Sequence, residues 1–153
     1  MTRNLFATFA LAFALPALAA TGGQAGVWEE FERRCLVPLE TVSPPITEGL
    51  AVGAKIDGGR FWENRRGGWS LAVGERDGLT NCTLFVADAH ADALASGYRA
   101  WADVAQTSGR YAQEGPSAVQ STEWREPRIE VHFLPADGTV QAQVWVMEVN
   151  VEA

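Results

Sequence analysis

Two runs near the end of the chain alternate between apolar and polar residues. The first run is Arg128–Leu134, and the second lies within Thr139–Val151. A period of two residues is typical of an antiparallel strand that has one face in the core and the other face in water. Between the runs, Pro135, Ala136, Asp137 and Gly138 have the composition of a turn. The pattern predicts a β-hairpin, and it requires other elements that cover the apolar face.

The register of this hairpin follows if Leu134 lies opposite Thr139. The residues of the apolar side then pair as Ile129 with Val144, Val131 with Ala142 and Phe133 with Val140. Those of the other side pair as Arg128 with Trp145, Glu130 with Gln143 and His132 with Gln141. Trp145 is a large aromatic residue that falls on the polar side. We expect another element to cover it, with exposure to a partner as the alternative.

The rest of the chain predicts helices and strands in a simple order. Short runs broken by glycine predict the strands Leu50–Ile56, Arg60–Glu63, Trp69–Val73 and Thr80–Ala87. Apolar residues at helical spacing predict one helix over Val27–Val37, ended by Pro38, and another after an N-cap at Asp88, through Ala105. Residues 106–116 are expected to form a loop, and Val119–Arg125 a further strand.

This order predicts an α+β domain, an antiparallel sheet with two main helices packed on it. Two loosely similar halves, each a helix followed by strands, are an alternative arrangement. No sequence identity between the halves indicates a duplication.

Residues 1–20 have the features of a signal peptide. Arg3 precedes an uncharged run from Leu5 to Leu18, and Ala17-Leu18-Ala19 fits the rule of small residues before a cleavage site. The run is shorter than the roughly 20 residues that cross a bilayer. We therefore expect a single mature domain over residues 21–153, periplasmic or secreted, without a membrane span.

The chain has two cysteines, Cys35 and Cys82, and both lie in the expected mature part. Disulfides persist in oxidising compartments, so we expect these two residues to be joined, tying the first helix to a strand. A loop of this length corresponds to a stabilisation of about 4 kcal/mol by the chain-entropy relation. The wide spacing and the lack of a C-x-x-C motif argue against a zinc site and a redox site.

Several of these features together resemble the uncharacterised small exported proteins of alphaproteobacteria, over most of the mature chain. The features are Trp28, Phe31, Cys35 and Pro38 on the first helix, Gly49-Leu50, Trp69 and Cys82 on strands, and the alanine-rich second helix. The resemblance implies export and a disulfide between helix and strand. It implies no catalytic residue.

The charge balance excludes some partners. Twelve Lys and Arg stand against 19 Asp and Glu, a formal charge of -7. This balance argues against binding of nucleic acid or polyphosphate.

Asp88, His90 and Asp92 have a spacing that would gather three metal ligands on one side of a strand, but on a helix they do not share a face. We therefore expect helix capping here, with no metal and no cofactor.

One candidate surface combines arginines with aromatic residues, which is the composition of interface hot spots. It contains Arg60, Trp62, Arg65, Arg66 and Trp69. In an acidic domain it could hold an anionic ligand or an acidic protein patch. The alternative, which we favour, is a solvated hairpin tip whose aromatic residues belong to the core.

The second candidate surface is the polar side of the hairpin, with Glu130, His132 and Trp145. Glu130 and His132 could form an acid-base pair, but no nucleophile or oxyanion motif accompanies them in the sequence. The sequence therefore favours a non-enzymatic binding or interaction module of the envelope. Its partner would be an envelope protein or an anionic ligand. The alternative is a small envelope enzyme or ligand-binding protein that uses the face of His132 and Glu130.

Overall fold

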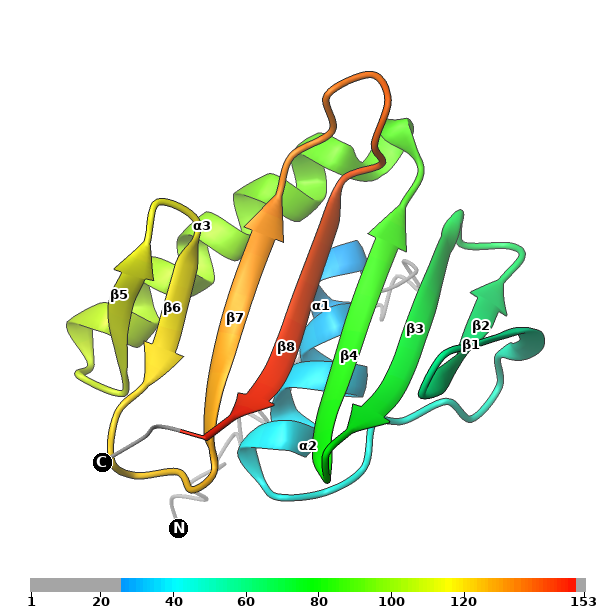
Figure 1. Ribbon diagram of the computed structural model, residues 1–153. Helices are drawn as coiled ribbons and strands as arrows, with labels where there is room; N and C mark the ends of the chain where they lie inside the picture. The colour runs from blue at the N-terminus through cyan, green and yellow to red at the C-terminus, as the bar shows by residue number, and fades with distance from the viewer. Residues whose placement is uncertain (1–25, 151–153) are drawn as a thin grey trace, which may run out of the picture.

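The computed structural model describes residues 26–150, and the expected signal peptide lies outside them. An antiparallel sheet of eight strands, in the order β1-β2-β3-β4-β8-β7-β6-β5, carries its helices on one face (Figure 1). The strands are β1 (Ala51–Ile56), β2 (Gly59–Asn64), β3 (Trp69–Arg76), β4 (Leu79–Val86), β5 (Tyr111–Gly115), β6 (Ala118–Ser121), β7 (Arg128–Leu134) and β8 (Gln143–Val149). The predicted α+β class is confirmed.

The helical layer has two parts. The first runs continuously through α1 (Val27–Phe31), the π-helical segment η1 (Glu32–Leu36) and α2 (Val37–Glu40). The second is α3 (Ala91–Thr107), which follows the 3-10 turn η2 (Asp88–His90). Among the described residues, no side chain caps the start of α3, and the N-cap position is His90, so the expected N-cap role of Asp88 is wrong. The turn of η2 takes the place of the cap.

Each half of the chain is a helical segment followed by a meander of four strands. The halves meet where β4 pairs antiparallel with β8 in the middle of the sheet. A two-fold axis through that junction would produce the same strand order. The arrangement of two similar halves, an alternative from the sequence, is therefore present in the topology.

The core lies between the sheet and the helices. Phe31, Cys35 and Leu39 from the first helical part are almost fully buried against Leu84 of β4 and Val146 of β8. A disulfide joins Cys35 to Cys82 of β4, which confirms the predicted bond between helix and strand. It fixes the helix across the centre of the sheet.

Pro38 does not end the first helix, as the sequence predicts; the helix continues to Glu40. A proline lacks the N–H that would bond to the carbonyl four residues earlier, here that of Arg34. The backbone N–H of Ile46 donates to this carbonyl instead, at 2.8 Å. Because the following connector supplies the missing donor, the helix tolerates the proline.

The last hairpin has a different register from the predicted one. Leu134 lies opposite Gln143, four residues from the expected partner Thr139, and His132 lies opposite Trp145. The loop is longer than expected because the Asp137 carboxylate accepts hydrogen bonds from Thr139 and Val140 in a local turn. Because the strand pairing is shifted by an even number of residues, every side chain of the hairpin strands stays on its predicted face of the sheet.

Residues 106–116 are not all loop, because β5 forms the far edge of the sheet within them. Tyr111 is buried in β5, and its hydroxyl donates to Glu40 Oε1 at 2.8 Å. The next three residues of the strand are exposed, so no alternation of apolar and polar residues marks it. A buried contact with the first helical part holds this edge in place.

Candidate functional site

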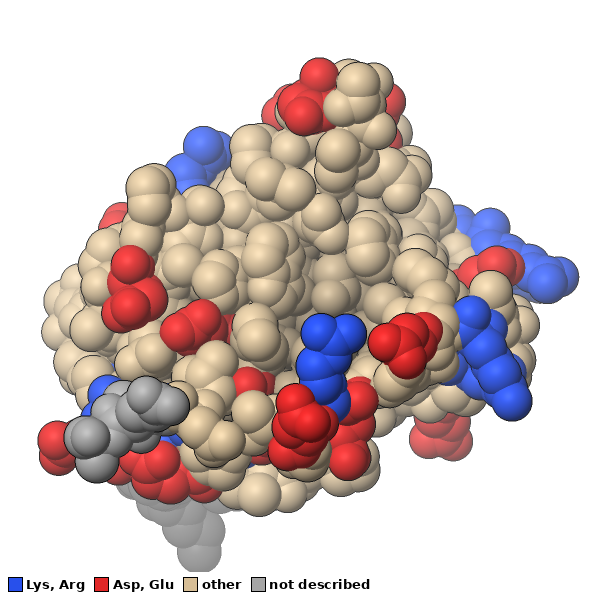
Figure 2. Space-filling model, viewed as in Figure 1, with Lys and Arg blue, Asp and Glu red and all other residues tan. Residues whose placement is uncertain are grey.

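Within residues 26–150, one face of the sheet carries no helix, and we call it the open face. Strand pairing and burial place a mixed set of apolar and polar side chains on it. They are Phe61, Ala72, Asn81, Thr83, Phe85, Gln120, Glu130, His132, Gln143, Trp145 and Met147. Figure 2 views the molecule from this side. Much of the centre is uncharged, and acidic and basic side chains gather along the lower border.

Two aromatic rings stack at the centre of the open face. The rings of His132 and Trp145 have centroids 4.8 Å apart and planes inclined by only 4°. They meet because β7 and β8 place the two residues directly opposite each other. The side chains of neighbouring residues on a sheet stand nearly perpendicular to it, which favours such a stack.

Hydrogen bonds hold the imidazole in this position. His132 Nε2 lies 2.9 Å from Glu130 Oε2, and the other carboxylate oxygen accepts a hydrogen bond of 2.9 Å from Gln120 Nε2. The side chains of His132 and Glu130 remain 24% and 19% exposed. The stack is therefore both ordered and accessible from solvent.

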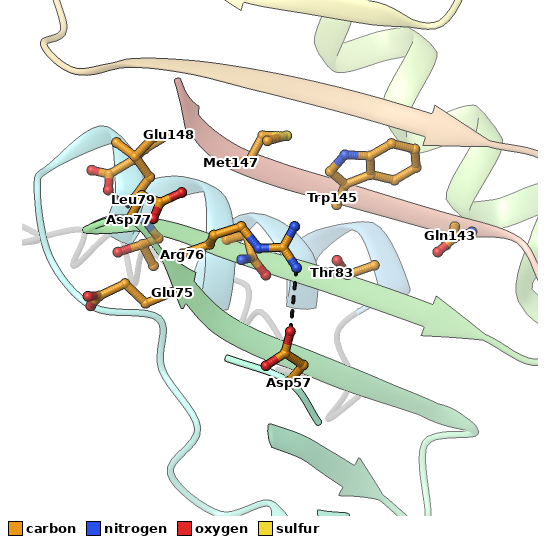
Figure 3. A pocket seen from close by; sticks show the side chains of 12 residues that line it. Asp57, Glu75, Arg76, Asp77, Leu79, Thr83, Gln143, Trp145, Met147 and Glu148 are labelled. Atoms are coloured by element: carbon orange, nitrogen blue, oxygen red, sulfur yellow. Dashed lines mark hydrogen bonds and ion pairs between the residues drawn. The ribbon is translucent and has the colours of Figure 1, made fainter. Parts of the chain in front are cut away.

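A groove of about 520 Å³ lies beside Trp145, over β4 and β8 (Figure 3). His132 of β7 is not among its lining residues, and the groove extends from Trp145 on the side of β4. Its lining consists of Asp57, Glu75, Arg76, Asp77, Leu79, Thr80, Asn81, Thr83, Gln143, Trp145, Met147 and Glu148. Among the described residues, the lining includes four acidic residues and one arginine. By strand alternation, the side chains of Glu75 and Glu148 lie on the helix side of the sheet.

The charged end of the groove comes from two turns. Asp77 has φ 56° and Gly78 φ 78°, a left-handed pair that forms the tight turn between β3 and β4. Arg76 extends from this turn over the groove, where its Nη2 lies 3.7 Å from Oδ2 of Asp57 (Figure 3). Both side chains are mostly exposed, at 79% and 99%. Exposed pairs of this kind contribute little stability.

The structure brings together one of the two predicted residue groups. Glu130, His132 and Trp145 form a single contact cluster. No element in residues 26–150 covers Trp145, so the expected cover is not found there.

The residues of the other group point in different directions. Trp69 is buried and Trp62 packs against the core, while the guanidinium of the buried Arg34 lies over the Trp69 ring. Arg60 lies opposite Val73 on the helix side of the sheet. The other two members, Arg65 and Arg66, occupy the exposed turn after β2, where Arg65 pairs with Glu63. Arg60, Trp62 and Trp69 therefore share the helix side of the sheet. Arg65 and Arg66 are the two members that lie apart from the aromatic rings.

Sequence reasoning missed Asp57, Arg76 and Asp77 as members of a site. The predicted strands leave gaps at the positions of these residues, yet the sequence analysis does not connect the two gaps. A usable signal was present, because the first and third turns of an antiparallel meander lie at the same end of the sheet. That rule places Asp57 next to the turn of Arg76 and Asp77.

Two further findings concern the part of the chain that the structure describes. No group of three or more His, Cys, Asp or Glu side chains is placed there to hold a metal ion. No helix in residues 26–150 combines the length and the apolar composition needed to cross a membrane. In comparisons with known proteins, no family model, curated protein or solved structure matches the chain.

Proposed function

We propose that the chain is an exported, non-enzymatic binding module of the cell envelope, and that the open face is its binding surface. The observation that carries the proposal is the ordered stack of His132 on Trp145, beside a groove on a sheet face that no element in residues 26–150 covers.

The composition of the open face supports this role. Aromatic residues near the centre of a surface, with charged residues around them, are typical of protein interfaces. Trp145 and Met147 are only partly buried although both are large and apolar. Their position on a rigid, fully paired strand means that little order is lost when a partner binds.

Export is supported by separate features. The N-terminal sequence has the pattern of a signal peptide, and the structure contains a buried disulfide between Cys35 and Cys82. Such bonds persist mainly in oxidising compartments such as the periplasm. Both features agree with a role in the envelope.

A small enzyme is the second candidate, and the contact between His132 and Glu130 favours it. A carboxylate that orients an imidazole is common at sites of general acid-base catalysis. Here the imidazole stacks on Trp145, and the residue opposite His132 on β6 is Ala118; neither is a nucleophile. The arrangement fits a positioned binding group better than a reaction centre.

The proposal is tested by capture from an envelope extract of the source organism. Immobilised mature, oxidised protein is compared with Trp145→Ala and with Trp124→Ala, a partly exposed tryptophan that lies against Arg110 instead of on the open face. We expect Trp145→Ala to lose specific partners that Trp124→Ala retains. The same bound set for all three proteins would rule out the open face as the binding surface.

A further inference from the structure

We infer that the groove beside Trp145 binds a positively charged segment of a partner protein, an extended peptide that presents an arginine or lysine side chain. This inference rests on the proposed binding role of the open face. It adds the chemistry of the partner and the place where its charge lies.

The charge of the groove points to a cation. Of its four carboxylates, Glu148 is already held by the buried Arg125 at 2.6 Å. Asp57 has only the weak exposed contact with Arg76, and within residues 26–150 neither Glu75 nor Asp77 forms an ion pair. Because Glu75 lies with Val73 on the helix side of β3, the acidic side chains of the groove are mainly Asp57 and Asp77. These two carboxylates outnumber the single guanidinium of Arg76, in a chain whose formal charge is -7. Such a field attracts cations and repels anions.

The apolar end of the groove suits the rest of a basic side chain. Trp145 and Met147 can contact its aliphatic stem while the charged head remains near the carboxylates. An indole ring is also the best aromatic partner for a guanidinium or ammonium group. Thr83, Asn81 and Gln143 add side-chain oxygens that can accept hydrogen bonds from the cation or its backbone.

Arg76 shows where a guanidinium fits. In Figure 3 its side chain runs from the turn over the groove, and its charged end faces Asp57. Because this contact is long and exposed, a cation from a partner can replace it. Arg76 is thus a competitor within the chain for the same carboxylates.

The shape of the site favours a peptide over a small molecule. Sites for small ligands usually enclose most of the ligand surface. Here the sheet forms the floor, and the hollow is open along the face (Figure 2). An extended segment can lie across several strands of such a floor while one basic side chain enters the groove.

The test uses two short blocked peptides, one with arginine and leucine at alternate positions and one with glutamate in place of arginine. Binding to the mature, oxidised protein is measured by titration calorimetry at low and at physiological salt. We expect the arginine peptide alone to bind, more weakly at higher salt. Arg76→Gln should strengthen its binding by about threefold, and Asp77→Asn should weaken it by a similar factor.

Arg66→Gln is the matched control, because it makes the same charge change in the exposed turn after β2 and should alter binding less than either groove variant. Circular dichroism confirms that every variant is folded. Binding of the glutamate peptide that is lost in Arg76→Gln would show that the groove takes an anion through Arg76. Weaker binding of the arginine peptide to Arg76→Gln would contradict the role of Arg76 as a competitor for the carboxylates. If neither peptide binds while capture still depends on Trp145, the cationic segment is ruled out and the binding role of the open face stands.

Discussion

Arg125 is a charged side chain with only 3% of its surface exposed, and three parts of the fold depend on it. Its guanidinium donates to the carbonyl of Leu39 at the end of the first helical part, to the carbonyl of Pro127 and to the carboxylate of Glu148. Glu148 also accepts a hydrogen bond from the backbone N–H of Thr80. The Arg125 side chain thus connects the helical layer to β8 and, through the carboxylate of Glu148, to β4.

We expect Arg125→Met to lower the free energy of unfolding by about 3–5 kcal/mol, because it leaves the mostly buried carboxylate of Glu148 without its cation. The matched control is Arg65→Met, which removes an exposed arginine paired with Glu63 and should cost less than about 1 kcal/mol. Urea denaturation of both variants measures the difference. Equal losses would mean that the Arg125 contacts add no stability.

Glu32 is a carboxyl group in the π-helical segment whose pKa is raised above the ordinary glutamate value. Burial is the main cause, and the nearby Glu40 and Glu29 add to it. The folded protein therefore holds this proton more tightly than the unfolded chain does. Stability from this group is present at low pH and is lost as the pH rises through the raised pKa, so ionised Glu32 opposes folding at neutral pH.

Glu32→Gln removes this penalty, and we expect it to raise the denaturation midpoint at pH 7. The gain should disappear below the ordinary glutamate pKa of about 4.3, where the wild-type side chain is also neutral. Midpoints of both proteins over a pH series test this. If Glu32→Gln is less stable than the wild type at pH 7, the ionised Glu32 side chain does not oppose folding, and the prediction is wrong.

The α3 helix packs against α1 at Gly97. A Cβ atom at this position would overlap Cβ and Cγ of Trp28, whose ring also contacts Tyr98 and Trp101. Glycine weakens the middle of a helix by about 1 kcal/mol relative to alanine. The close approach of the Trp28 side chain explains why glycine is found in this helix.

We expect Gly97→Ala to destabilise the protein by about 1–3 kcal/mol, because overpacking against Trp28 outweighs the gain in helix propensity. Ser96→Ala is the control at an exposed neighbouring position, where better propensity alone should leave stability equal or slightly higher. Thermal denaturation of the two variants should give shifts of opposite sign. A stabilised Gly97→Ala would show that the helices can move apart without cost.

The strands show which structural facts follow from sequence alone. Alternation determines the face of each residue, so Ile129 and Val131 are buried as predicted, and His132 lies on the side of Trp145. The partner across the ladder depends on the turn, and a turn built by the Asp137 side chain is not visible in the alternation. The cluster of Glu130, His132 and Trp145 was thus predictable as a shared face, but the ring stack was not.

A double-mutant cycle distinguishes the two registers. His132→Ala and Trp145→Ala should be coupled by about 0.5–1.5 kcal/mol, as is usual for stacked aromatic rings. His132→Ala and Gln141→Ala, which pair only in the register expected from the sequence, should be additive because Gln141 lies in the exposed loop. Coupling in the second pair without coupling in the first would restore the expected register.

The two halves of the molecule share one core. β4 of the first half and β8 of the second lie side by side, with Leu84 and Val144 opposite each other and fully buried. Tyr111 of β5 also reaches Glu40 of the first half, and burial together with that carboxylate raises the pKa of its phenol. The hydroxyl therefore stays protonated as a donor. The two halves therefore cannot separate without exposing apolar side chains of the core to water.

The Cys35–Cys82 disulfide lies within the first half, across a separation of 47 residues, yet its effect should extend to the whole molecule. Replacing both cysteines by alanine should lower the free energy of unfolding by about 4 kcal/mol, because the unfolded chain regains the freedom of a closed loop. Since the core spans both halves, far-UV circular dichroism and tryptophan fluorescence should still report a single coincident transition. Wild-type protein in reducing agent is the control and should unfold at nearly the same midpoint as the variant. Two separate transitions would show that the first half depends on its disulfide while the second half folds without it.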